Sequence, residues 1–440
     1  MDHNVLYPSV YLLIKIMTEK IYSKNLGYYL IIFNILLQII LFRNYINGDI
    51  ISALHPFFGD SREYVSTTEF WLKSNDFIST FKNGWRLPGY NTFMLLTYKL
   101  AAILNVNPLF LVRILQLLAT SFIPFFCYKA VLNYSKSTNT ALFAGFIIAI
   151  YYPFYYYTAE IGAESISLFF ISILFYQVSI ISIRVINIKN ILCIAFNIAL
   201  LTYFKPNHIL FSIPIGILLI NRKQFFSKQF FLSIKKPLIL ALFVIFLLFP
   251  WVLFVSLQNK TFIPLATTSG VDMVIGTGLP INPDNRDTTT LPYKFEMKYN
   301  LVADTIFLKD KKGFTNAQEN KAFQTEAVAI WKSRPLITVK YGIIKIAHSM
   351  GLGFRGMKDY FSFIVLFSAL AILFCSAAFR RKYKNLVIFD FILFLLFYLQ
   401  CFIYFGDMRL RILMLDMPIV LTTALYIYDT YKRIFKNSIF

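Results

Sequence analysis

The chain contains the stretch KPLILALFVIFLLFPWVLFVSL at residues 236–257, and no charged side chain follows Lys236 within it. About 20 consecutive apolar residues in a helix are enough to cross the hydrocarbon core of a bilayer. A helix that is apolar on every face has to be surrounded by lipid or by a protein core. This stretch therefore predicts a transmembrane helix.

The composition extends that prediction to most of the chain. Of the 440 residues, 58% are hydrophobic and 15% are charged, and the mean hydropathy is +0.61. We therefore expect an all-α polytopic membrane protein, since a helix satisfies its own backbone hydrogen bonds in lipid. Ten apolar runs are expected to cross the membrane: 26–46, 109–132, 138–155, 159–183, 189–204, 206–220, 236–257, 361–379, 385–405 and 411–430.

The basic residues predict the orientation of these helices. The chain has 43 Lys and Arg against 22 Asp and Glu, a formal charge of +21. They gather in turns between apolar runs, which is typical of cytoplasmic loops beside anionic membrane lipids and argues against a nucleic-acid partner. The expected cytoplasmic groups are Lys15, Lys20 and Lys24; Lys129 and Lys136; Arg184 and Lys189; Arg222, Lys223, Lys228, Lys235 and Lys236; Arg380, Arg381, Lys382 and Lys384; and Lys432, Arg433 and Lys436.

This orientation makes a demand on the borderline run 88–104. The hydrophilic stretch 47–87 and the basic turn around Lys136 fall on opposite sides only if 88–104 does not cross. We therefore expect a re-entrant or juxtamembrane helix there and ten transmembrane helices in all, with eleven as the alternative.

The same count divides the chain into three regions. An N-terminal transmembrane region (1–257) contains the first outer loop, 47–87. A large extracytoplasmic loop (258–358) and a C-terminal transmembrane region (359–440) follow. Both hydrophilic loops then face the outside.

The first outer loop combines acids with a cation. Asp60, Glu63 and Tyr64 lie close together, and Arg86 precedes the run 88–104. A carboxylate at a membrane surface can accept a proton from an incoming hydroxyl or amine, and a nearby cation can hold a phosphate leaving group. The alternative is an ordinary outer loop that carries some charges.

Two further places on the predicted outer side carry polar residues. Glu160 and Glu164 open a membrane run, four residues apart, and are expected on one helix face. Simple capping of the helix explains one of them. Lys205 and His208 flank Pro206 in an otherwise apolar run, where the proline breaks the helix. The alternative there is an ordinary turn.

The last helix begins with two arginines. Arg409 and Arg411 are two residues apart and do not share a helix face, so at most one is expected to point at a site while the other snorkels to the interface. In the large loop, the run from Thr267 to Asp272 is rich in Gly and Thr and reads as a turn. Residues 322–333 predict an amphipathic helix.

Taken in order, these pieces resemble the GT-C superfamily of polytopic glycosyltransferases, and in particular the bacterial relatives of protein O-mannosyltransferases and the lipid A aminoarabinose transferase. The resemblance covers nearly the whole chain. Its motifs are Asp60 with Tyr64, Arg86-Leu87-Pro88-Gly89-Tyr90-Asn91, Glu160 or Glu164, Lys205-Pro206, Ser269-Gly270, Glu326-Ala327 followed by Pro335, and Arg409-Leu410-Arg411 with Pro418. The chain departs from the family pattern in three places: Lys205 stands for an arginine, one proline is missing after Arg86, and only Pro418 follows the last motif.

The resemblance implies an inverting hexosyl or pentosyl transferase at the outer face of a bacterial inner membrane. Its donor would be a sugar on an undecaprenyl- or dolichyl-type phosphate, and its acceptor a glycan, a lipid or a protein. By the same resemblance, Asp60 would be the general base. Arg86, Lys205 and Arg409 or Arg411 would hold the donor phosphate. Glu63, Tyr64, Glu160, Glu164 and His208 would position the sugar or the acceptor.

Two matters stay open at this stage. No His, Cys or acid cluster has metal-ligand spacing, so no cofactor is expected, yet a divalent metal is not excluded because relatives differ in this respect. The alternative function is a polysaccharide polymerase or flippase of the cell envelope. Such a protein is expected to carry its function in arginine-rich outer loops or in charges along a central transmembrane channel, whereas here acids and bases gather at the outer helix ends.

Overall fold

The computed structural model describes residues 26–41, 60–158, 160–181, 187–220, 230–276, 316–349, 377–404 and 408–437. Within these ranges the chain forms helices joined by turns, without a strand, so the all-α prediction is confirmed for this part of the protein. The helices up to residue 219 are Leu26–Leu41, α2 (Asp60–Ser74), α3 (Phe77–Phe81), α4 (Gly89–Leu104), α5 (Pro108–Ser121), α6 (Ile123–Ser135), α7 (Thr138–Ile150), α8 (Tyr152–Tyr156), α9 (Ala163–Ile181), α10 (Ile188–Phe204), a 3₁₀-helix (Pro206–Phe211) and α11 (Ser212–Leu219). The later helices are α13 (Phe230–Asn259), α14 (Ser269–Gly276), α16 (Asn316–Ser333), α17 (Pro335–Ser349), α19 (Ala377–Lys382), α20 (Lys384–Ile403), α21 (Met408–Arg411), a π-helix (Ile412–Asp416) and α22 (Met417–Asn437).

Five helical segments among the described residues are long and apolar enough to cross a membrane: Pro108–Ser135, Ala163–Ile181, Phe231–Asn259, Lys384–Ile403 and Arg409–Lys432. Four shorter apolar helices, Leu26–Leu41, Thr138–Ile150, Ile188–Phe204 and Pro206–Leu219, correspond to four more of the predicted runs. Of the remaining run, residues 361–376 lie outside the described part of the chain. The structure thus contains the elements of a polytopic membrane protein.

Proline accounts for most of the helix breaks inside the predicted runs. The run 138–155 divides at Tyr151, just before Pro153, and α10 ends at Phe204, just before Pro206. Proline disfavours helical geometry in the residue before it and lacks the N–H that would continue the ladder. The break at Pro206 confirms the predicted one, whereas the break at Tyr151 divides a run that the sequence pattern suggested was continuous.

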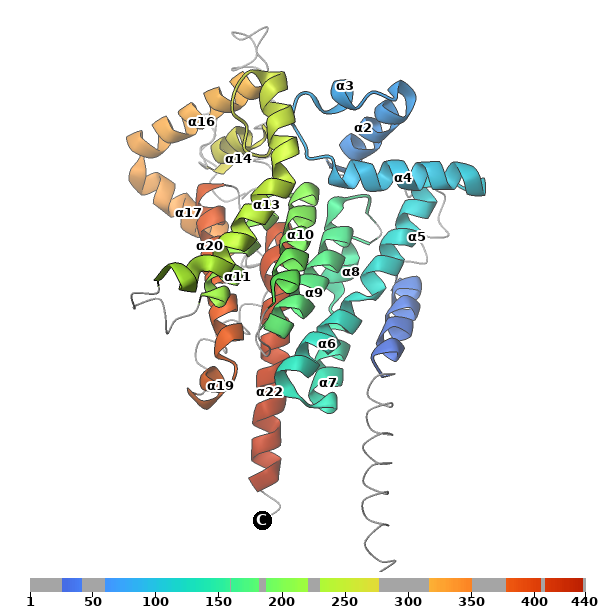
Figure 1. Cartoon of the computed structure of the whole chain (residues 1–440), viewed down its shortest axis with the longest axis vertical. Helices are drawn as coiled ribbons and strands as arrows, with labels where there is room; N and C mark the ends of the chain where they lie inside the picture. The colour runs from blue at the N-terminus through green and yellow to red at the C-terminus, as the bar shows by residue number, and fades with distance from the viewer. Residues whose placement is uncertain are drawn as a thin grey trace, which may run out of the picture.

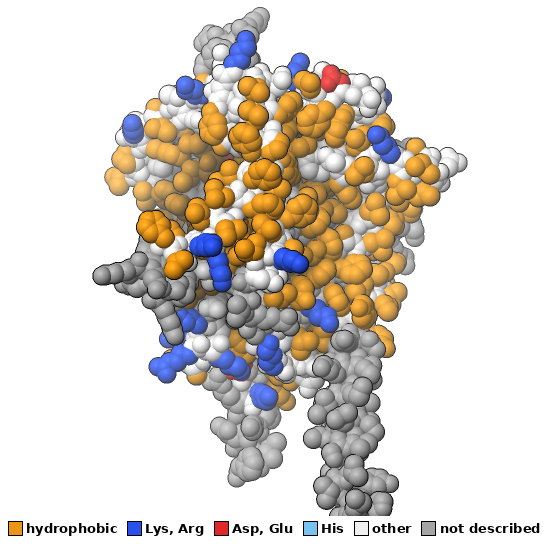
Figure 2. All heavy atoms as spheres, viewed as in Figure 1, with side chains coloured by type: hydrophobic (Ala, Val, Ile, Leu, Met, Phe, Trp, Pro, Cys, Tyr) orange, Lys and Arg blue, Asp and Glu red, His pale blue; other side chains and the backbone are white. Residues whose placement is uncertain are grey.

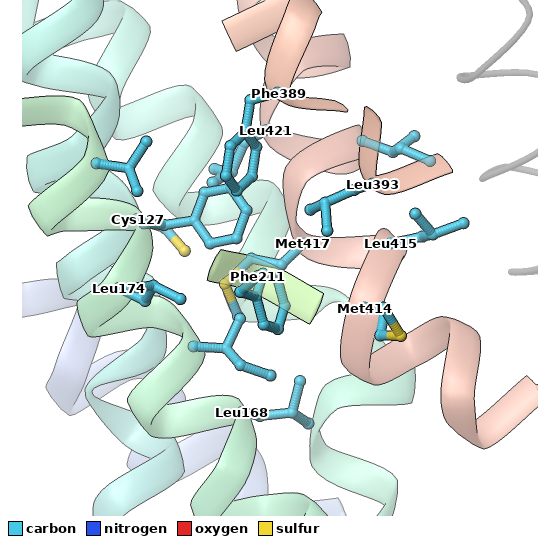
Figure 3. Packing of buried hydrophobic residues seen from close by; sticks show 14 of the residues in the cluster. Cys127, Leu168, Leu174, Phe211, Phe389, Leu393, Met414, Leu415, Met417 and Leu421 are labelled. Carbon is cyan, nitrogen blue, oxygen red and sulfur yellow. The ribbon is translucent and has the colours of Figure 1, made fainter. Parts of the chain in front are cut away.

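The largest apolar cluster in the interior of the bundle is contributed by helices from both halves of the chain. Figure 3 shows Phe389 and Leu421 from the C-terminal helices beside Cys127 of α6, with Phe211 and Leu168 lower in the view, in the same cluster. Burial of large side chains of this kind contributes about 1.5–3 kcal/mol each in a protein that water surrounds. In lipid, close packing and dispersion hold such helices together instead.

The outside of the bundle is apolar as well. Figure 2 shows hydrophobic side chains spread over its flank, with Lys and Arg side chains gathered toward the ends. On α13, Phe246 is 68% exposed and Leu257 is 66% exposed. An apolar surface of this extent suits contact with lipid.

The elements between the long helices lie at two opposite ends of the bundle (Figure 1). Helices α2, α3, α14 and α16, which come from the two predicted outer loops, lie at one end. The basic helix α19 and the C-terminal end of α22 lie at the other. Helix α4 lies across the direction of the long helices, beneath α2.

Candidate active site

Six charged side chains meet at the end of the bundle that carries α2. Five ion pairs join them: Arg86 Nη2 with Asp60 Oδ1 (2.6 Å) and with Glu63 Oε2 (2.7 Å), Arg409 Nη1 with Asp60 Oδ2 (2.9 Å) and with Glu164 Oε1 (3.4 Å), and Lys205 Nζ with Glu164 Oε1 (2.6 Å). We call these six residues the charge cluster. Its three cations and three carboxylates balance, so the cluster as a whole is neutral.

The first two acids come from the start of α2. Asp60 is the first residue of the helix and Glu63 lies in its first turn, where the helix dipole favours negative charge. Within the stretch predicted as the first outer loop, Asp60 therefore opens a helix of 15 residues. A helix start fixes the direction of both carboxylates better than a loop does.

Arg86 is held by the turn between α3 and α4. Gly84 has a φ of +64°, a left-handed conformation that favours glycine. Its carbonyl accepts a hydrogen bond from Thr267 N at 2.9 Å, and the Lys82 carbonyl accepts one from Asn259 Nδ2 at 2.8 Å. The large loop and the end of α13 thus fasten the turn that presents Arg86.

Glu164 and Lys205 meet because α9 begins where α10 ends. Glu164 lies in the first turn of α9, and Lys205 follows the last residue of α10. Gly89, at the start of α4, lies so close to α10 that a Cβ added to it would be 2.5 Å from the Tyr203 carbonyl oxygen. This close approach brings the Arg86 turn next to Lys205.

Aromatic and amide side chains pack next to the charge cluster and connect it to neighbouring helices. The Arg86 guanidinium carbon lies 4.9 Å from the centre of the Tyr64 ring, a cation–π contact, and Tyr64 packs edge-to-face on Tyr90. Tyr90 donates to Gln116 Oε1 at 2.5 Å, and Gln116 Nε2 donates to the carbonyls of Thr158 and Glu160 at 3.0 and 2.8 Å. Gln116, which the sequence analysis did not single out, therefore joins α4 to the segment before α9.

The cluster controls the ionisation of its members. Burial would raise the pKa of Asp60, but the charges of Arg409, Arg86 and Lys205 outweigh burial and hold this pKa well below the usual range of a carboxyl. Burial lowers the pKa of the Lys205 ammonium, and the Glu164 carboxylate opposes that change. Asp60 is therefore ionised and weakly basic while both arginines contact it.

Two predicted positioning residues take no part in the five ion pairs named above. Glu160 precedes α9, which begins at Ala163, so Glu160 and Glu164 do not share a helix face and that prediction is wrong. His208 is fully buried in the 3₁₀-helix, where Nδ1 lies 3.0 Å from the Leu201 carbonyl oxygen and the ring packs on Phe211. In this structure His208 supports the break after α10 from the core side.

The two arginines of the last helix separate as the sequence predicts, but Arg411 does not snorkel. Arg411 is 0% exposed, and its Nε donates to Asp416 Oδ1 at 2.8 Å. Its Nη1 donates to the Ser349 carbonyl, and Tyr151 donates to Asp416 from the other side. Residues Ile412–Asp416 form a π-helix, which turns Asp416 toward Arg411 in the interior. Arg409 points to the charge cluster instead.

The segment predicted as a Gly- and Thr-rich turn starts a helix instead. Ser269 and Gly270 open α14, and a Cβ at Gly270 would lie 2.2 Å from the Asn320 carbonyl oxygen on α16. Asn320 Oδ1 also accepts from Gly270 N at 2.5 Å. Helix α16 begins before the predicted 322–333 and includes all of it.

Helix α14 adds a fourth acid close to the charge cluster. Asp272 lies in its first turn and is half-buried. Burial raises its pKa to about 7, although the charges of Arg86 and Arg409 act in the opposite direction. The sequence analysis quoted Asp272 but assigned it no role, and only its acidic type within a run suited to close backbone contact could have drawn attention to it.

The described residues contain no group of three or more His, Cys, Asp or Glu side chains arranged to hold a metal ion. The site instead consists of cations and carboxylates in direct contact, arranged so that an incoming anion can compete with a carboxylate for an arginine. No model of a known protein family matches the chain, and a search of curated proteins finds no match either.

Proposed function

We propose that the protein is an inverting glycosyltransferase that takes a sugar from a polyprenyl-phosphate donor at the outer face of a cytoplasmic membrane. The observation that carries this proposal is the charge cluster, in which residues from five distant parts of the chain meet at one end of an apolar bundle. The resemblance to GT-C glycosyltransferases, drawn from the order of the sequence motifs, supports the same conclusion.

The cations of the cluster suit a phosphate that is attached to a lipid. Arg86 and Arg409 are each about one quarter exposed, whereas Lys205 is 11% exposed and lies deeper. Arginine offers several donors in a planar fork that matches phosphate oxygens, and lysine adds a compact charge. An isoprenoid chain attached to the phosphate needs an apolar environment, and the flank of this bundle provides an apolar surface for it.

Binding of the donor would change the partners of the arginines. Arg86 and Arg409 both form ion pairs with Asp60. A donor phosphate would compete for both guanidinium groups, and the Asp60 carboxylate would then lose part of the positive field that lowers its pKa. The site thus exchanges one set of charge-assisted hydrogen bonds for another as the donor enters.

The proposed reaction is a single displacement. An acceptor hydroxyl or amine gives its proton to a carboxylate of the site, and its oxygen or nitrogen forms a bond to the anomeric carbon. The bond between that carbon and the phosphate oxygen breaks, and the phosphate leaves with the electron pair. Arg86, Arg409 and Lys205 would stabilise the negative charge that develops on it. One displacement inverts the anomeric centre.

The proposed topology has ten transmembrane helices, with both hydrophilic loops outside. Helices α2 and α14, from these two loops, lie at the same end of the bundle, and the basic α19 lies at the opposite end (Figure 1). Helix α4, which lies across the long helices, would rest along the outer membrane surface as the rim of the donor site. The positive-inside rule then puts α19 in the cytoplasm.

The test is transfer of radiolabelled sugar in reconstituted membranes, with a panel of polyprenyl-phosphate sugars as donors and native membrane extracts as acceptors. Wild-type protein should consume at least one donor, and Arg86→Gln should reduce the rate about 10²–10³-fold, the usual effect of removing one charge-stabilising donor. Arg334→Gln, at an exposed arginine between α16 and α17, is the matched control. If wild-type protein consumed no donor of the panel, the polymerase would become the better hypothesis.

A further inference from the structure

Three of the four acids at the site are already bound to cations. Asp60 contacts Arg86 and Arg409, Glu63 contacts Arg86, and Glu164 contacts Lys205 and Arg409. Asp60, which lies between two guanidinium groups, holds its negative charge firmly and is a weak base. These three acids are therefore arranged to fix the cations in place.

Asp272 differs from them because it forms no ion pair with a residue that the structure describes. The start of its helix is tied to the Arg86 turn by two hydrogen bonds, from Thr267 N to the Gly84 carbonyl (2.9 Å) and from Thr267 Oγ1 to the Asn83 carbonyl (3.2 Å). Asp272 lies five residues after Thr267, in the first turn of α14. These hydrogen bonds place the start of α14 beside the turn that carries Arg86, and the charges of the cluster act on Asp272 there.

The far side of α14 is held equally firmly. Gly270 fits against the Asn320 backbone of α16, where any side chain would collide. At the other end, Lys345 of α17 donates to the carbonyls of Gly276, Phe402 and Tyr404, at 2.5, 2.9 and 2.6 Å. A helix fixed at both ends keeps its acid in one position, which catalysis requires.

We propose that Asp272 is the general base that receives the proton of the acceptor. This inference rests on the proposed function and adds a catalytic residue to it. Asp60 then has a different role: it holds Arg86 and Arg409 in place until the donor phosphate takes over both guanidinium groups.

The surroundings of Asp272 fit this role. The charged groups that act on it are Arg86, Asp60, Arg409 and Lys205, and Asp272 in turn acts on Tyr404, which follows α20. The side chains of α16 that hold the start of α14, Asn320 and Gln324, are uncharged. Half-burial raises the pKa of Asp272 to about 7, which is suitable for a base that works near neutral pH.

The experiment measures sugar transfer against pH for wild-type protein, Asp272→Asn, Asp272→Glu and Asp60→Asn in reconstituted membranes. For wild-type protein, kcat/KM should fall below about pH 7, as Asp272 becomes protonated. Asp272→Asn should reduce kcat about 10²–10⁴-fold, the usual contribution of a general base, with little change in the KM of the donor. Asp272→Glu should keep part of the wild-type kcat, and its kcat/KM should again decrease at low pH. Glu69→Gln, at an exposed acid of α2, is the control and should behave as wild type.

Asp60→Asn separates the two carboxylates. If Asp272 is the base, the residual activity of Asp60→Asn should keep the fall below pH 7 and show a raised donor KM, because Arg86 and Arg409 have lost their shared partner. Wild-type kcat in Asp272→Asn would overturn the inference, as would a fall at low pH that disappears in Asp60→Asn and persists in Asp272→Asn. Neither result would affect the proposed function, which fails only if wild-type protein transfers no sugar.

Discussion

Arg409 Nη1 lies 2.9 Å from Asp60 Oδ2, although 349 residues separate the two in the chain. The same Arg409 nitrogen lies 3.4 Å from Glu164 Oε1, so the guanidinium of Arg409, in α21, connects the starts of α2 and α9. Bringing together residues so far apart in the chain costs conformational entropy. The packing of the whole bundle has to offset that free-energy cost. The charge cluster is therefore a product of the complete fold.

We expect Arg409→Gln to reduce sugar transfer about 10²–10³-fold, because it removes a donor to the leaving phosphate. It also removes the positive charge that does most to lower the pKa of Asp60, so this pKa should rise toward the usual value of a carboxyl. Arg409→Lys keeps the charge but loses the planar fork, so its rate should lie between the two. The measurement is the initial rate at saturating donor. A rate within about twofold of wild type in Arg409→Gln would contradict the role of this residue, and Arg334→Gln is the control.

The contact between α4 and α10 gives a second prediction. In Gly89→Ala, the added Cβ would lie 2.5 Å from the Tyr203 carbonyl oxygen and 2.9 Å from Phe204 N, and neither backbone atom can move cheaply. Helix α4 should therefore shift away from Lys205 and carry the Arg86 turn with it. We expect a loss of transfer of about 10-fold or more, since small misplacements of catalytic groups are costly.

Gly216→Ala is the matched control for that substitution. Gly216 lies in α11, and the nearest atom to an added Cβ is 3.9 Å away, on Pro237. Alanine is favoured over glycine inside a helix by about 1 kcal/mol. This variant should keep full activity and an equal or higher unfolding temperature in detergent. Equal activities for the two variants would show that the α4–α10 contact does not position the site.

Arg411 should prove to be structural. Among the described residues, Arg411→Met would leave the buried Asp416 carboxylate with Tyr151 as its hydrogen-bond donor, and loss of one member of a buried ion pair costs about 3–5 kcal/mol. The unfolding temperature in detergent should fall sharply. The double variant Arg411→Met with Asp416→Asn should recover much of the loss, because no unpaired charge remains. Normal stability together with lost donor binding in Arg411→Met would instead put Arg411 in the site.

Local patterns account for what the sequence analysis predicted well. The run 236–257 lies within α13. It could be predicted because the length of an uncharged apolar segment is a local property of the sequence, and the thickness of the bilayer sets the length required. The order of the motifs predicts Asp60, Arg86, Lys205 and Arg409 as site residues, and the structure brings all four together. What could not be predicted was pairing, since nothing local distinguishes Arg409 from Arg411. The inward turn of Asp416 depends on a π-helix that leaves no clear mark in the sequence.

Asp272 shows the same limit from the other side. Its segment was read as a turn because Gly and Thr favour loops, yet the close fit of Gly270 on α16 makes it the start of a helix. The chemical property that distinguishes Asp272, its raised pKa, arises from burial by elements that are distant in sequence. No inspection of residues 267–272 alone could have revealed it.

The raised pKa of Asp272 also predicts how stability depends on pH. Burial raises this pKa to about 7 in the folded protein, whereas an unfolded chain has an Asp pKa of about 3.9. Between these values the folded protein keeps a proton that the unfolded chain has released. The contribution of Asp272 to stability is therefore greatest below about pH 4, falls as the pH rises, and reaches its lowest level above about pH 7. An asparagine side chain does not titrate, so Asp272→Asn should unfold at a higher temperature than wild type at pH 8, and this difference should vanish near pH 4.

The measurement is the unfolding temperature of both proteins in one detergent across that pH range, with Glu69→Gln as the control. A variant that is more stable at pH 8 yet transfers sugar far more slowly would show that the fold carries an unfavourable buried carboxylate for the sake of the reaction. If Asp272→Asn were instead less stable than wild type at pH 8, the Asp272 carboxylate would have to be stabilised by Arg86 and Arg409. It would then belong with Asp60 among the acids that hold the cations, and the acceptor's proton would have to go elsewhere.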